Sequence, residues 1–170
     1  SLQKALRGLE TGRSGFEGPD RGAAVDDETL RRKLARPSSD RLLYLRLALE
    51  RGMTVPELAE LTAVDPWFLD QLAELAAAER ALKKGGLDAG ALREAKRLGF
   101  SDAQIARARG MSEGGVRGLR RKWGVLPGYK LVDTCAAEFE AYTPYYYSTY
   151  DGEGEVRPSG KRKKVAILGS

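Results

Sequence analysis

The sequence contains no histidine and only one cysteine, Cys135. Without histidine, the chain lacks the side chain that most often serves as a general base or a metal ligand. A single cysteine cannot form a disulfide framework or a cysteine metal cluster within the chain, and this usage is typical of a reducing compartment. We therefore expect Cys135 to be a buried, inert thiol.

Long apolar runs are also missing from the chain. No stretch approaches the roughly 20 apolar residues that cross a bilayer, and the first residues, SLQKALRGLETG, lack the apolar core of a signal peptide. We therefore expect a cytoplasmic protein with no membrane partner. A length of 170 residues is enough for one compact module with extensions.

The longest helical pattern runs from Asp65 to Lys84. Asp65 can cap the first turn, Pro66 fits the first helical position, and the Gly85-Gly86 pair can end the helix in a left-handed conformation. Apolar residues at spacings of three and four predict one apolar stripe, made of Phe68, Leu69, Leu72, Leu75, Ala76 and Leu82. At 1.5 Å per residue, this helix is about 28 Å long.

The chain also contains an internal repeat, in which residues 52–72 align with residues 99–119. Each copy opens with a capping box, Thr54 with Glu57 and Ser101 with Gln104. A short helix, a tight turn and a second capped helix follow in each copy. The repeat predicts two helix-turn-helix units that share the long helix over 66–84.

Further helices are predicted from the same signals at 1–12, 26–36, 40–51 and 88–98. The first would end at Gly12 and present Leu2, Ala5, Leu6 and Leu9 on one face, which no neighbouring segment covers. Residues 13–27 are rich in glycine and are predicted to form a loop. Ser38 or Ser39 would start the third helix. The fold class is therefore all-α, an irregular helical array with two helix-turn-helix-like units and an extended, non-helical C-terminal tail.

The tail after Trp123 is rich in tyrosine and acids. Five tyrosines lie between 142 and 150, but we expect no partner strand for the extended stretch TPYYYSTYD. Six acidic residues and no basic residue occur over 131–155, whereas nine basic and three acidic residues occur over 93–122. These two oppositely charged segments are explained as well by docking to each other, within the chain or between subunits, as by binding of the basic segment to nucleic acid.

A DNA-binding function is one alternative, because residues 101–124 resemble the helix-turn-helix of bacterial DNA-binding proteins. Arg117 and Arg120 would then reach base edges, and Arg121 and Lys122 would contact phosphates. Glycines at 114, 115 and 118 weaken this alternative, since each costs up to about 1 kcal/mol in a helix relative to alanine. The second helix of the first copy also begins without any positive charge, as PWFLDQLAEL.

The sequence offers no catalytic pattern, because no glycine-rich phosphate loop opens a helix and no nucleophile has an evident base. We therefore assign no catalytic, cofactor-binding or metal residue. Trp67 and Phe68 could belong to a core or to an interface, and the tyrosines favour packing between domains. The candidate packing or interface residues are Trp67, Phe68, Leu72, Leu75, Arg117, Arg120, Tyr145, Tyr146 and Tyr147.

Three stretches, VDPWFLDQLAEL, YKLVDTCAAEFEAYTPYYYSTYDGEGEV and KKVAILGS, together resemble the middle of the large subunit of carbamoyl phosphate synthases. The N-terminal SLQKALRGLETGRSGF resembles the end of the first ATP-grasp half in that family. The resemblance implies four segments: the tail of that half over 1–18, a helical oligomerisation domain over 19–126, a linker over 127–164, and the first strand of the second half over 165–170.

The resemblance also implies a function. The whole enzyme would make carbamoyl phosphate from bicarbonate, ATP and glutamine-derived ammonia, for arginine and pyrimidine biosynthesis. It would use ATP, Mg²⁺ or Mn²⁺, and K⁺, together with a small glutaminase subunit. No catalytic motif of the family falls within this sequence. We therefore expect an inactive connecting segment that binds no cofactor, contacts the rest of the large subunit, and associates with itself as a dimer or tetramer without nucleic acid.

Overall fold

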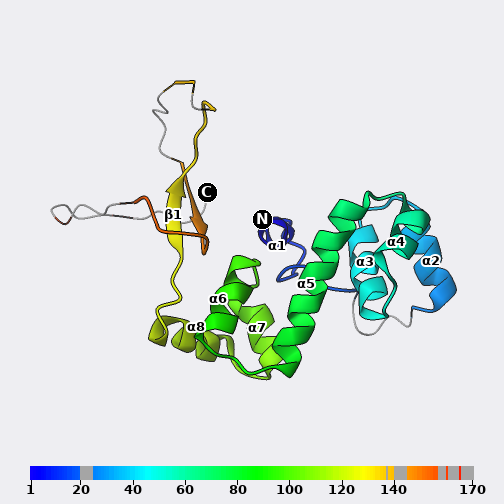
Figure 1. Ribbon diagram of the computed structural model, residues 1–170, viewed down its shortest axis with the longest axis horizontal. Coiled ribbons are helices and arrows are strands. Elements are labelled where there is room, and N and C mark those ends of the chain that lie inside the picture. The colour runs from blue at the N-terminus through cyan, green and yellow to red at the C-terminus, as the bar shows by residue number, and fades with distance from the viewer. Residues whose placement is uncertain (20–24, 137, 140–144, 157–159, 161–164, 166–170) are drawn as a thin grey trace. The chain divides into compact units, whose positions relative to one another are not determined.

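The computed structural model describes residues 1–19, 25–136, 138–139, 145–156, 160 and 165. The chain divides into two compact units, Ser1–Val125 and Leu126–Ser170, which are described separately. In its described residues the first unit is helical and the second contains a small sheet (Figure 1). The predicted all-α class with a non-helical tail is therefore confirmed, with one addition in the tail.

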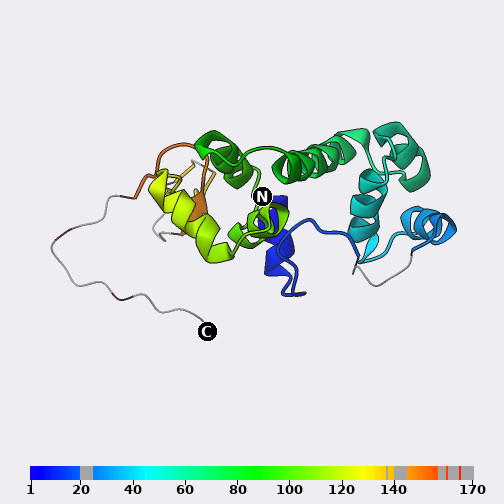
Figure 2. The same ribbon diagram turned by 90° about the horizontal axis from the view of Figure 1, so that it is seen from below.

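The first unit is arranged along one long helix, α5, which spans Pro66–Lys84. Two groups of shorter helices pack on it, as Figures 1 and 2 show. The group near its N-terminal end comprises α2 (Asp27–Ala35), α3 (Arg41–Glu50) and α4 (Val55–Thr62). The other group comprises α6 (Ala89–Arg97), α7 (Asp102–Arg109) and α8 (Glu113–Lys122), and a short N-terminal helix, α1, spans Leu2–Gly8.

The predicted repeat is present in the local structure. Both capping boxes form, with Thr54 and Glu57 at the start of α4 and Ser101 and Gln104 at the start of α7. Both short helices then end at a left-handed residue, Ala63 with φ 54° and Gly110 with φ 64°. The two residues are equivalent in the repeat, so the same sharp turn leads into α5 and into α8.

Helix α5 begins and ends where the sequence predicts, with the Asp65 side chain accepting a hydrogen bond from the Trp67 N–H. One detail was predicted wrongly, because Gly85 is extended rather than left-handed, with φ −82° and ψ 176°. Phe68, for which the sequence left both a core and an interface position open, is exposed. The rest of the stripe packs into a core of buried apolar side chains that includes Leu34, Leu45, Leu58, Leu69, Leu72 and Ala76.

The first helix differs most from its prediction. It ends at Gly8 rather than Gly12, and Leu9, which follows it, is 65% exposed. The expectation that its face has no partner is also wrong, because Leu2 and Leu6 pack against the core and Gln3 is fully buried. Helix α3 is preceded by Asp40 instead of Ser38 or Ser39, and the Asp40 carboxylate accepts hydrogen bonds from Lys33 and Ser38 rather than capping the helix.

The second unit contains strands β1 (Gly128–Leu131) and β2 (Tyr146–Thr149). They pair antiparallel, with Tyr129 opposite Ser148 and Leu131 opposite Tyr146. The prediction that the tyrosine stretch has no partner strand is therefore wrong, because GYKL after Pro127 pairs with it. Cys135 is half-buried rather than buried. The strand predicted over 165–170 lies outside the described residues except for Val165.

Candidate functional site

The candidate residues on α5 separate into two groups. Leu72 is buried and Leu75 is partly buried, and both pack in the core. Trp67 and Phe68 are 62% and 57% exposed, and their rings meet edge to face with centroids 5.0 Å apart. Because large aromatic side chains are costly to leave in water, this exposed pair is a candidate contact surface.

The two candidate arginines of α8 also lie in different environments. Arg117 is exposed and pairs with Glu113 one turn earlier, at 3.4 Å. The Arg120 side chain is mostly buried instead, and its Nε and Nη2 atoms both donate to Asp102 Oδ2 at 3.2 Å. Its Nη1 donates to the Val125 carbonyl. Arg120 is therefore not positioned to reach base edges, and that part of the DNA-binding hypothesis is wrong.

Asp102, at the start of α7, is the centre of a buried ion cluster. Its other oxygen, Oδ1, accepts from Lys96 Nζ at 2.9 Å, and Lys96 also donates to the Phe100 carbonyl. Side chains of Asp102 and Lys96 are each only 9% exposed. Burial by itself would raise the pKa of Asp102, but Lys96 and Arg120 outweigh it and hold that pKa below its ordinary value. The cluster joins α6, α7 and α8.

We expect the free energy of unfolding to decrease as the pH is lowered into the acid range. The lowered pKa of Asp102 means that its contribution is complete above the unfolded value of about 3.9 and is lost as pH falls through the folded value. Urea unfolding should be followed by circular dichroism at pH 7, 5, 4 and 3. The urea concentration at the midpoint should decrease once the pH is lower than 5. An Asp102→Asn variant should show a smaller fall. Equal falls in both proteins would contradict this assignment.

A second buried polar cluster fixes the N-terminal segment. The Gln3 side chain is 1% exposed; its Oε1 accepts hydrogen bonds from Gln104 Nε2 at 2.8 Å and from the Phe16 N–H at 3.2 Å. Its Nε2 donates to the Leu98 carbonyl. Gly15 passes so close that an added Cβ would lie 2.5 Å from the amides of Gln3 and Gln104. Residues near the N-terminus are thus tied to the second repeat unit.

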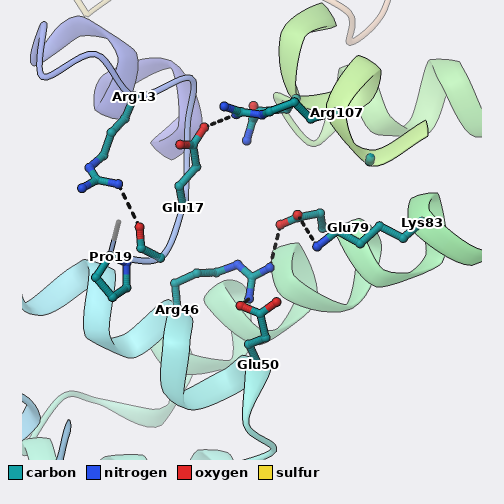
Figure 3. A pocket seen from close by; sticks show the side chains of 11 residues that line it. Arg13, Glu17, Pro19, Arg46, Glu50, Glu79, Lys83 and Arg107 are labelled. Atoms are coloured by element: carbon teal, nitrogen blue, oxygen red, sulfur yellow. Dashed lines mark hydrogen bonds and ion pairs between the residues drawn. The ribbon is translucent and has the colours of Figure 1, made fainter. Parts of the chain in front are cut away.

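A charged pocket of about 460 Å³ lies between the N-terminal loop, α3, α5 and α7 (Figure 3). Arg46, which is 3% exposed, donates to Glu79 Oε2 at 2.7 Å and lies 3.6 Å from Glu50. Glu79 also pairs with Lys83 at 2.9 Å, and Glu17 pairs with Arg107. The three carboxylates of the lining are thus each in an ion pair. These pairs connect α3 with α5, and the N-terminal loop with α7, within the first unit.

The candidate tyrosines lie on the second unit. Tyr145, Tyr146 and Tyr147 are all exposed, and Tyr147 lies opposite Lys130 in the sheet. An isolated two-stranded sheet is only marginally stable in water. Its exposed aromatic side chains are therefore candidates for contact with another part of a larger protein.

Comparison with known proteins places the chain in a family. The sequence model of the family described as "Carbamoyl-phosphate synthetase large chain, oligomerisation domain" matches residues 1–124. The chain belongs to this oligomerisation-domain family. It is also 49% identical to the carbamoyl phosphate synthase large chain of Rhodopirellula baltica and 51% identical to that of Gemmatimonas aurantiaca, over 99% and 100% of its own length.

The chain spans 16% of the length of these relatives. The family match begins at residue 1 and covers the helical unit, including the buried Gln3 and Asp102 clusters. Among the described residues, no helix is long and apolar enough to cross a membrane, and no group of three His, Cys, Asp or Glu side chains could hold a metal.

The polar residues that hold this domain together were not predicted from the sequence. Gln3 and Arg46 lie in helices that were assigned from apolar spacing, and Asp102 lies in a helix that was assigned from the Ser101 and Gln104 capping box. One signal was available for Arg46, since it is the single charge within the apolar run LLYLRLAL. A charge in such a position must face either water or a buried partner.

Proposed function

We propose that this chain is the segment that links the two synthetase halves of a carbamoyl phosphate synthase large chain and through which copies of that chain self-associate. The match of residues 1–124 to the family's oligomerisation domain is the observation that carries this proposal. Residues 1–18 would be the tail of the first half, 19–126 the domain itself, 127–164 a linker and 165–170 the start of the second half.

The whole enzyme would be cytoplasmic and would catalyse the ATP-dependent synthesis of carbamoyl phosphate from bicarbonate and glutamine-derived ammonia. Its relatives carry that enzyme's name. ATP, Mg²⁺ or Mn²⁺, K⁺ and the glutaminase subunit would bind outside this segment, and the segment alone would be inactive. Nucleic acid would not be a partner, since Arg120, one of two side chains proposed to reach bases, is held by Asp102.

Light scattering on the purified chain over a wide concentration range, at moderate salt, tests self-association directly. We expect the average mass to rise from that of a monomer toward a dimer or tetramer as concentration increases, because apolar and charged faces of the helical unit are exposed. A monomer at every concentration would contradict the proposal. Bicarbonate-dependent ATPase activity in a clean preparation would contradict the inactive role.

A further inference from the structure

The second helices of the two repeat units present equivalent exposed faces. On α5 the face consists of Trp67, Asp70, Gln71 and Glu74, and all four are exposed. On α8 the face consists of Gly114, Arg117, Gly118 and Arg121, which are also exposed. In each helix the spacing is i, i+3, i+4 and i+7, which places the four residues on one side. The two sets are related by the 47-residue offset of the repeat.

These two faces are complementary at each equivalent position. The acids Asp70 and Glu74 of α5 correspond to the bases Arg117 and Arg121 of α8. The large Trp67 and the longer Gln71 correspond to Gly114 and Gly118, which have no side chain. One face is acidic and raised, and the other is basic and recessed. Opposite charge and opposite relief at matched spacing are what two surfaces need in order to pack together.

In the part of the chain that the structure describes, nothing requires the exposed glycines of α8 to be small. An added Cβ at Gly114 or Gly118 would meet no atom within 4 Å, whereas one at Gly115 would lie 3.3 Å from Met111 and Ser112. Neither Gly114 nor Gly118 has a positive φ. Glycine is unfavourable in a helix, so the fold of one copy would be served better by alanine at position 118.

The two faces lie apart within one copy. Trp67 is at the N-terminal end of α5, whereas both views place α8 near the opposite end of that helix (Figures 1 and 2). About 28 Å of helix separates the two ends. A contact between the two faces therefore requires a second molecule.

We propose that the Trp67 face of α5 docks onto the glycine and arginine face of α8 in a second copy of this chain. The inference rests on the proposed self-association and names its surface. Trp67 would pack over the recessed strip at Gly114, and Asp70 and Glu74 would pair with Arg117 and Arg121. Because each copy carries both faces, a reciprocal contact buries both and closes the assembly.

Charge reversal tests this contact. Sedimentation equilibrium would compare the chain with D70K/E74K, with R117E/R121E and with all four substitutions together. Each double variant places like charges opposite each other and should weaken association by at least about tenfold. The fourfold variant carries the same charge pairs with their signs exchanged. Its dissociation constant for self-association should be close to that of the unsubstituted chain. The control R36E/R93E changes net charge as much as R117E/R121E, at exposed sites elsewhere, and should change association little.

A second variant separates docking from folding. Gly118→Leu should fold with an unchanged or raised Tm, because a Cβ there meets open space, but should weaken association about tenfold by filling the strip. Association that persists unchanged in both double variants would overturn this surface while leaving the proposed function intact. A chain that stays monomeric without any substitution would overturn both. Loss of association in the fourfold variant would overturn the pairing.

Discussion

Replacing Asp102 with asparagine is expected to lower the free energy of unfolding of the helical unit by about 3–5 kcal/mol. Asparagine has nearly the same volume, so the change removes charge without creating a cavity. Lys96 and Arg120 would remain largely buried without the carboxylate that pairs with both of them. Burial already lowers the pKa of Lys96 against the opposing effect of Asp102, so loss of that partner leaves a costly buried cation. Urea unfolding at pH 7, followed by circular dichroism, measures the change.

Glu113→Gln is the matched control, because it also removes one carboxylate from an ion pair of the same repeat unit. The Glu113 and Arg117 side chains are each more than half exposed, so their pair should contribute less than about 1 kcal/mol. If the two variants lose similar stability, the Asp102 cluster is not the electrostatic centre of this unit. Comparable stability of the original protein and the Asp102→Asn variant would lead to the same conclusion.

Replacing Gln3 with alanine should destabilise the fold by about 2–4 kcal/mol and release α1. Two buried groups, the Gln104 amide and the Phe16 N–H, and one partly buried group, the Leu98 carbonyl, would lose their partner. An unpaired buried polar group costs about 1–3 kcal/mol. Urea unfolding gives the size of the loss. Faster tryptic cleavage after Arg7 and Arg13 would show that the N-terminal segment opens first.

Gln71→Ala provides the comparison, since it makes the same chemical change at an exposed helical position. In dilute solution it should change the unfolding free energy by no more than about 0.5 kcal/mol. Unchanged cleavage after Arg7 in the Gln3→Ala variant would show that apolar contacts of Leu2 and Leu6 alone hold α1. The N-terminal segment would then not be coupled to the second repeat unit through hydrogen bonds.

Local signals predicted the helices of this protein well. The capping boxes at Thr54 and Ser101 and the start of α5 at Asp65 are formed by atoms within three residues of one another. Such contacts depend only on nearby sequence, so the sequence can specify them. The end of α1 was predicted less well, because Gly12 is a typical residue at a helix end. In the folded protein, Gln3 and Arg7 instead donate hydrogen bonds to the carbonyls of Leu98 and Gly99, which are distant in the sequence.

The tertiary structure decided which polar side chains are buried. Arg117 and Arg120 are equally basic and only three residues apart, yet Arg117 is exposed and Arg120 is turned inward toward Asp102, 18 residues away in the sequence. The pairing of β1 with β2 likewise brings together segments separated by the stretch 132–145. Neither outcome can be deduced from charge or periodicity alone.

The amino-acid sequence alone specifies the helical class, the repeat with its paired caps, and the family, because each depends on short-range patterns or on sequence similarity. The internal positions of Gln3 and Asp102, and the open positions of Trp67 and Gly118, become known only from the folded structure. Burial is a property of the assembled helices. A side chain's neighbours across 95 or 101 residues, as for Gln3, exist only after the chain has folded.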